Sequence, residues 1–241
     1  MSDSTKGEIG RVKRFYDKAS FTPVEAGFQI WLDDKPVKTP AKADLHVPAE
    51  SLAKALTKEW QAQGEWVEPQ AMLITKLVNS AIDHVDANRD AVVDDIVKLA
   101  SSDMICYLAE EPQELMMRQM AQWGPVIDWV AQGLGAKFEV VIGVNHVEQS
   151  ADALARVRFA VKDFDSFSLT AIHSMTSLTG STLLTLANIA GLFELVTVWQ
   201  SAHIDEDWQA ARWGEDEGAK ARRERRWLEM QAADKLFNSM R

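Results

Sequence analysis

Short apolar runs separated by turn residues fill the first 50 positions of the chain. The run 28–32, Phe-Gln-Ile-Trp-Leu, is typical of a β-strand, and the Asp-Asp-Lys-Pro at 33–36 is typical of a turn. The segments 37–39 and 45–47 are predicted to be further short strands, each next to a proline. Because a few short strands rarely form a stable sheet alone, we expect a small antiparallel sheet that needs support from elsewhere.

After Pro48 the apolar positions take a helical period. Leu52, Leu56 and Trp60 are spaced so that they share one helix face. The same reasoning predicts helices over 49–63, 73–85, 88–108, 114–123, 125–133, 150–164, 166–190 and 192–238, the last with an interruption near Gly214. An isolated strand or extended crossover is predicted over 137–144. The expected class is α+β, with a small β-rich domain over 1–50 and a helical domain over 51–241.

An unusual carboxylate lies in the last helical stretch. On a helix, residues seven apart lie nearly one above the other, so Trp199, Glu206 and Trp213 fall on one stripe that we expect to face largely inward. An unpaired buried charge is costly. Glu206 therefore has an internal Arg or Lys partner, is simply exposed, or meets a partner on another molecule.

Composition and charge narrow the possible classes of protein. The 241 residues carry a formal net charge of −10, which opposes non-specific binding to nucleic acid. The single cysteine, Cys106, cannot form an internal disulfide and is expected to be a small buried apolar residue, as in a reducing compartment. No apolar stretch reaches the roughly 20 residues that span a bilayer, and the first residues lack a signal core.

Candidate chemistry is scarce. The five histidines show no metal-ligand spacing, and the Gly-Leu-Gly-Ala-Lys at 133–137 lacks the rest of a phosphate loop, so no metal or cofactor is expected. The basic run 222–226 is expected to be a solvated helix face, with docking of an acidic partner as the alternative. Met116, Met117 and Met120 are expected to fill the core, although such residues also form adaptable binding surfaces.

Several motifs, taken in order, resemble the assembly chaperones that hold the α subunit of F1-ATPase. The resemblance extends from about residue 14 to residue 229. It rests on Lys-Arg-Phe-Tyr at 13–16, Leu-Asp-Asp-Lys-Pro at 32–36, Glu-Trp-Gln-Ala-Gln-Gly at 59–64, Asp-Met-Ile-Cys-Tyr at 103–107, Gln-Trp-Gly-Pro at 122–125, Leu-Thr-Gly-Ser at 178–181 and Asp-Glu-Asp-Trp-Gln at 205–209. No single string is specific, but their order and spacing are.

The resemblance implies both a fold and a function. It implies a small N-terminal sheet domain, a larger helical domain, and ATP-independent binding of the unassembled α subunit until the β subunit replaces it. The family's important acidic position corresponds to Glu206, with Asp205, Trp208 and Trp213 as further partner-binding candidates. Trp60 corresponds to the family's glutamate–tryptophan motif, and its place on an amphipathic helix predicts a packing role.

Two other functions remain open at this point. One is a small acid/base enzyme that uses Glu206 in a tryptophan-lined pocket, with His203 as the nearest second group. The other is a passive structural subunit of the ATP synthase. The leading expectation is a chaperone without enzymatic activity, membrane insertion or nucleic-acid binding. It is expected to be a monomer when free and to work in a bacterial cytoplasm, or in the mitochondrial matrix if the chain is a processed eukaryotic form.

Overall fold

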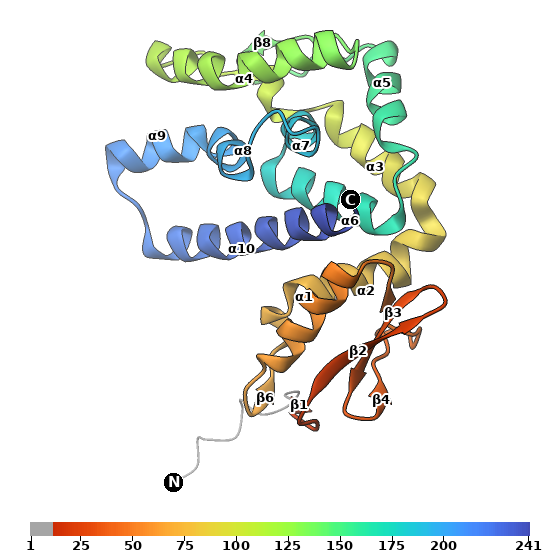
Figure 1. The fold of residues 1–241 in the computed structure, drawn as a ribbon. Helices are drawn as coiled ribbons and strands as arrows, with labels where there is room; N and C mark the ends of the chain where they lie inside the picture. The colour runs from red at the N-terminus through yellow and green to blue at the C-terminus, as the bar shows by residue number, and fades with distance from the viewer. Residues whose placement is uncertain (1–11) are drawn as a thin grey trace.

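The computed structural model describes residues 12–241 and divides into a sheet-containing part and a helical part (Figure 1). The sheet is built on the antiparallel hairpin of β2 (Ala19–Val24) and β3 (Gly27–Leu32), in which Ala19 pairs with Leu32 and Val24 with Gly27. Strands β4 (Lys35–Pro36) and β5 (His46–Val47) both pair with β3. The predicted strand at 28–32 and the turn after it are confirmed.

Two local features explain this hairpin and its missed partner strand. Asp33 lies in the turn with φ of 52°, and its carboxylate accepts hydrogen bonds from the backbone amides of Asp17 and Lys18. Aspartate tolerates this left-handed backbone better than most residues do. Strand β2 was not predicted from the sequence, because its second half is exposed and contains Pro23, which leaves no clear alternation of apolar residues.

Helix α1 (Glu50–Gln61) supplies the support that the sheet requires. It covers the sheet with Leu52 and Leu56, which are fully buried together with Ile30 and Leu45. Beyond α1, strand β6 (Trp66–Val67) returns to pair with β1 (Val12–Lys13). The chain after residue 50 thus contributes to the packing of the sheet, and the predicted domain boundary at that residue stays a prediction.

The rest of the chain is mostly helical, as predicted. The helices of this part have the following bounds: α2 Leu73–Ser80, α3 Arg89–Ala100, α4 Gln113–Gly133, α5 Ala151–Val161, α6 Ser166–Thr179, α7 Thr182–Ile189, α8 Leu195–Ala202, α9 Ile204–Trp213 and α10 Glu217–Ser239. A π-helical turn, Ala81–Val85, continues α2. Ser150 caps α5 as expected, accepting a hydrogen bond from the amide of Ala153.

Several predicted boundaries were wrong. The two helices predicted on either side of Gly124 are one helix, α4, which runs through Pro125; a proline removes one helical hydrogen bond, and burial of Trp123 and Val126 outweighs that loss. Helix α3 ends at Ala100, because Asp103 starts a separate turn by accepting from the amide of Ile105. Of the strand or extended crossover predicted over 137–144, only β8 (Val141–Ile142) is a strand, parallel to β7 (Tyr107–Leu108), and the segment contains no helix.

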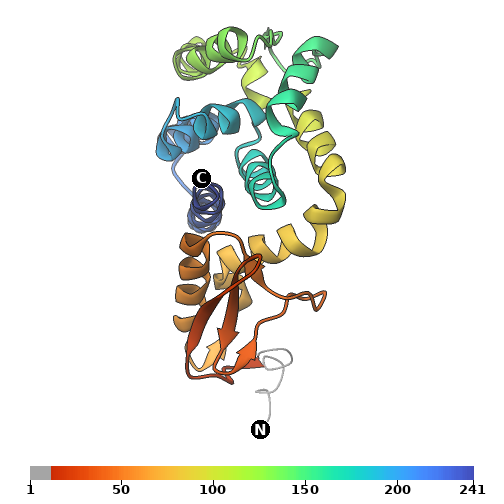
Figure 2. The ribbon, with the colours of Figure 1, turned by 45° about the vertical axis from the view of Figure 1, so that its right-hand side comes forward.

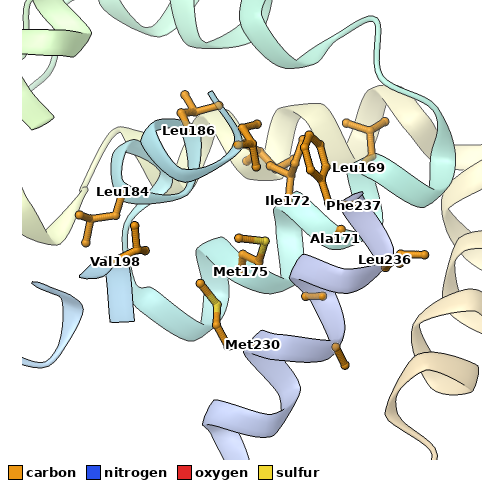
Figure 3. Close-up of a cluster of buried hydrophobic side chains, with 14 of the residues drawn as sticks. Leu169, Ala171, Ile172, Met175, Leu184, Leu186, Val198, Met230, Leu236 and Phe237 are labelled. Atoms are coloured by element: carbon orange, nitrogen blue, oxygen red, sulfur yellow. The ribbon is translucent and has the colours of Figure 1, made fainter. Parts of the chain in front are cut away.

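The core of the helical part lies where α6, α7 and α10 meet. Figure 3 shows Ile172 and Met175 of α6 pointing toward Met230 and Phe237 of α10, and all four are buried. Gly180 ends α6 with φ of 69°, a left-handed C-cap that glycine adopts without strain. The predicted apolar stretch 166–190 is therefore two closely packed helices.

Helix α10 joins the two parts of the molecule. It packs against α6 on one side and against α2 and α1 on the other (Figures 1 and 2). The chain enters α10 from α9 through Gly214, whose φ of 85° confirms the predicted interruption. We call this turn, with the facing sides of α9 and α10, the elbow.

Candidate functional site

The stripe that singled out Glu206 is broken in the structure. His203 has a non-helical backbone, with φ of −118° and ψ of 21°, and separates α8 from α9. Trp199 on α8 is buried, whereas the Glu206 side chain is 59% exposed and Trp213 is 77% exposed. The expectation of an inward-facing stripe was therefore wrong. Three acids in the first turn of α9 favour a new helix start there, since acids stabilise helix N-termini.

The three consecutive acids of that turn have different surroundings. Asp205 is half-buried and accepts a hydrogen bond of 2.7 Å from the Gln119 amide of α4. Asp207 forms an ion pair with Arg223 of α10, and this hydrogen bond raises the pKa of Arg223. Glu206 has no Lys or Arg partner within ion-pair distance among residues 12–241. Of the three, Glu206 is the one whose charge remains available.

His203 is the nearest titratable group to Glu206. Its Nε2 lies 3.5 Å from the Glu206 carboxylate, and its Nδ1 lies 2.7 Å from the Trp199 carbonyl oxygen. Burial lowers the pKa of His203, although the Trp199 carbonyl and Glu206 oppose the shift. A carbonyl can only accept, so Nδ1 carries the proton and Nε2 of the neutral ring turns a lone pair toward the carboxylate. In these forms neither Nε2 nor the carboxylate carries a proton that it could donate to the other.

The two tryptophans of α9 also differ. Trp208 is buried and lies between two guanidinium groups, with Arg212 4.1 Å and Arg118 4.7 Å from its ring centroid. Such stacking favours a structural role, because cations are attracted to the faces of aromatic rings. Trp213, at the end of α9, presents its indole to solvent. Of the four predicted partner-binding residues, Glu206 and Trp213 are the two that lie open.

Glu206 and Trp213 line one wall of a cavity of about 430 Å³ inside the elbow. The opposite wall is α10, which contributes Arg222, Arg223 and Arg226. Arg223 is held by Asp207, and Arg226 donates to the Leu178 carbonyl oxygen at 2.6 Å. The basic run was expected to be a solvated helix face, and its position at this cavity was not predicted. The sequence did carry a signal for it, because the arginines are spaced i,i+3 and i,i+4 on one helix and three consecutive acids precede them in the chain.

The family-like motif at Glu59 and Trp60 has a structural explanation. The Glu59 carboxylate accepts from the amides of Ile74 and Thr75, at 2.9 and 2.8 Å, and from the Thr75 hydroxyl at 2.6 Å. It thereby satisfies orphan donors at the start of α2. Trp60 is half-buried and packs edge-on against Tyr16, with ring centroids 5.8 Å apart, which agrees with the predicted packing role.

The Lys-Arg-Phe-Tyr motif is structural in the same way. The guanidinium of Arg14 donates to the carbonyl oxygens of Tyr16, Asp17 and Gln63 at 2.9, 2.8 and 2.6 Å. The Tyr16 hydroxyl donates to the Trp60 carbonyl oxygen at 2.7 Å. These bonds attach the first described residues to the end of α1, so the motif stabilises the sheet-containing part.

A second apolar surface contradicts one expectation. Met117 and Met120 on α4 are 61% and 53% exposed, whereas Met116 is half-buried. The prediction that these methionines fill the core was therefore wrong for two of the three. Exposed, unbranched thioether side chains suit an adaptable contact surface.

The remaining chemical candidates are confined to the core or absent from the described chain. Cys106 is buried, as expected, and burial raises the pKa of its thiol. Over residues 12–241, no three His, Cys, Asp or Glu side chains come together in a way that could hold a metal ion. None of the helices in that range combines the length and apolar character that a bilayer crossing requires.

Comparison with known proteins identifies one family. The model of the ATP12 chaperone protein family matches residues 13–131. A candidate chaperone from Agrobacterium tumefaciens has 44% identity and a TM-score of 0.92, over 96% of this chain and 87% of that one. Atp12 from Paracoccus denitrificans has 37% identity and a TM-score of 0.89, over 95% and 98%. A lysine-substituted mutant of that Atp12p has 36% identity and a TM-score of 0.88, over the same shares of the two chains.

Proposed function

This chain belongs to the ATP12 chaperone family, and on that premise we propose that it binds the unassembled α subunit of F1-ATPase. Bound there, it prevents aggregation of the α subunit and releases it to the β subunit during assembly of the ATP synthase. Family membership makes the chain an assembly chaperone. The identity of the subunit and the transfer to β are the proposed parts.

The observation that carries this proposal is the open pair of Glu206 and Trp213 at the elbow. A largely exposed indole and an exposed carboxylate without a Lys or Arg partner in the described chain line the same cavity. Tryptophan is also enriched at binding hot spots. Such a pair suits a partner with an apolar surface and a basic residue.

The client chemistry agrees with this arrangement. A subunit that lacks its neighbours exposes apolar interface surface, which aggregates. A chaperone must cover that surface and still yield to the true partner. Charge complementarity contributes specificity and association rate more than affinity, so Glu206 can guide binding without preventing release.

The proposal also gives the compartment. The protein meets its client where F1 is assembled, in a bacterial cytoplasm or a mitochondrial matrix, and we expect it to be a monomer when free. Catalysis by Glu206 and His203 gains no support from the geometry. The His203 lone pair faces the carboxylate, and although Glu206 lines the elbow cavity its side chain is largely exposed to solvent.

The test is an aggregation assay with denatured F1 α subunit diluted into buffer with and without this protein. We expect suppressed light scattering and a complex that co-elutes in gel filtration and dissociates when β subunit is added. The passive-subunit alternative predicts instead that the protein stays in the assembled enzyme. Scattering unaffected by the protein, with no complex, contradicts the proposal.

A matched pair of variants locates the interaction. Glu206→Lys reverses the open charge and is expected to weaken binding of the α subunit at least tenfold while the circular dichroism spectrum stays unchanged. Asp128→Lys makes the same change at an exposed acid of α4 outside the elbow and is expected to bind normally. Equal binding by both variants would remove Glu206 from the interface.

A further inference from the structure

A cavity of about 630 Å³ lies on the side of α10 opposite the main helical core. Its walls come from α1, α2, the loop after β4 and α10, so residues far apart in the sequence form it together. Figures 1 and 2 show this junction, where α10 passes over α1 and α2. We call this cavity the α2 cleft. Its volume is within the range of known ligand sites.

The α2 cleft is lined by both apolar and polar side chains, and two of its residues carry polar atoms without partners. Met72, Leu73 and Val67 provide apolar surface. Trp60 Nε1 and Asn79 Oδ1 are buried and make no hydrogen bond within the described chain. One is a donor and the other an acceptor. Native proteins rarely leave such groups unpaired, and each case calls for an explanation.

The charges around the α2 cleft are also unevenly paired. Lys38 is paired with Asp44, and the Asp83 carboxylate accepts from the Thr39 hydroxyl and the Ala41 amide. Lys76 of α2 and Arg225 of α10 have no acid within ion-pair distance among residues 12–241. Two acids, Asp83 and Glu229, line the cavity as well, and no ion pair holds Glu229 in the described chain. The lining therefore carries one more cation than acids, and in a chain of net charge −10 this local excess favours a negatively charged occupant.

We propose that the α2 cleft binds an extended peptide segment of the client subunit that carries apolar side chains and a carboxylate. The backbone of such a segment offers an acceptor to the Trp60 indole and a donor to the Asn79 amide. Its apolar side chains cover Leu73 and the half-buried Trp60 ring, and its carboxylate pairs with Lys76 and Arg225. This inference rests on the proposed function and adds to the elbow a second contact with the same client.

The first test is site-specific photocross-linking from a cysteine introduced at the α2 cleft. Because Cys106 is buried, a cysteine introduced at the surface is the accessible one, and it can carry a benzophenone photocross-linker. Gln70→Cys places the probe at the α2 cleft, and Gln231→Cys places it on an exposed part of α10 outside the described cavities. With F1 α subunit added, we expect cross-links from position 70 to a short segment containing apolar and acidic residues, and none from position 231.

The second test changes the recognition groups. Lys76→Glu and Arg225→Glu are expected to weaken α-subunit binding at least tenfold, whereas Lys235→Glu, the same charge change elsewhere on α10, is expected to bind normally. Trp60→Phe keeps the aromatic ring and removes the donor, so a several-fold loss at unchanged melting temperature is expected. In the wild type, the Trp60 indole proton resonance should shift downfield on binding.

The outcomes separate the two proposals. If the wild-type protein binds the α subunit but position 70 gives no cross-link and Arg225→Glu binds like Lys235→Glu, the α2 cleft is not the site and the chaperone function stands. If the wild type does not bind the α subunit at all, both proposals fail. A cross-linked segment without acidic residues contradicts the assigned role of Lys76 and Arg225.

Discussion

Two glutamate–tryptophan pairs in this protein are used in opposite ways. Glu59 and Trp60 lie at the corner between α1 and α2, where the carboxylate accepts three hydrogen bonds and the indole packs on Tyr16. Glu206 and Trp213 lie at the elbow, where the carboxylate has only His203 nearby and the indole faces solvent. The Glu59 carboxylate and the Trp60 ring therefore stabilise the fold at the corner, whereas the Glu206 carboxylate and the Trp213 ring stay exposed at the elbow.

The largest difference is expected for the tryptophans. Trp60→Arg forces a charged side chain into a half-buried aromatic contact and should lower the free energy of unfolding by about 3 kcal/mol, near the lower end for loss of a packed tryptophan. Trp213→Arg should change it by less than about 0.5 kcal/mol, as surface substitutions do. Urea denaturation measures both. A Trp60→Arg protein as stable as the wild type would contradict the packing role of the corner.

The glutamates should show the same contrast at a smaller scale. Glu59→Ala leaves the amides of Ile74 and Thr75 without acceptors and should cost about 2 kcal/mol of stability. Glu206→Ala removes no Lys or Arg ion pair in the described chain and should cost less than about 0.5 kcal/mol. Thermal melts of the two variants, with Glu59→Gln as a partial rescue, check this. Similar losses at both positions would mean that Glu206 is structural.

Arg14 offers a finer test of the corner. Arg14→Lys keeps the charge but cannot reach several carbonyl oxygens at once, since a single ammonium lacks the guanidinium fork. We expect a loss of about 1 kcal/mol, the typical value of a hydrogen bond. Arg222→Lys at the elbow should be neutral for stability. Equal melting temperatures for the wild type, Arg14→Lys and Arg222→Lys would show that the Arg14 guanidinium contributes little to stability.

The smallest effect is expected at His203, whose protonation makes the stability of the protein depend on pH. Burial holds the pKa of His203 below its ordinary value of 6.5. As the pH falls through 6.5, the unfolded chain takes up a proton that the folded protein does not, so stability decreases on acidification and is retained above that pH. Urea midpoints at pH 7.5 and 5.5 should differ less for His203→Gln than for the wild type. If the urea midpoints of His203→Gln differ between the two pH values as much as those of the wild type, His203 does not contribute to the pH dependence of stability.

Predictions from the sequence were correct for features that depend on a few adjacent residues, and they failed for features that depend on distant ones. The hairpin turn at 33–36, the cap at Ser150 and the break at Gly214 were all predicted, because each depends on a few adjacent residues. The break at His203 was missed, since a seven-residue spacing describes a stripe only while the helix is continuous. Helix α4 was divided in two because a proline was given more weight than the burial of its neighbours.

The candidate site shows the same limit. Sequence order and motif spacing were sufficient to identify the family, and they selected Glu206 and Trp213 together with Asp205 and Trp208. Spacing could not separate the open residues from the engaged ones. Asp205 accepts a hydrogen bond from Gln119 of α4, and Trp208 contacts Arg118 of the same helix, 86 and 90 residues earlier in the chain.

The amino-acid sequence alone determined the α+β class, most helices and the family, because helical periodicity, turn residues and motif order are properties of neighbouring positions. The tertiary structure decided which carboxylate is a cap and which stays free, and it assembled the α2 cleft from four separate segments. The physical reason is that burial and pairing depend on distant segments. Whether Glu59 finds the amides of α2, or Glu206 finds no cation, is settled only when the helices pack.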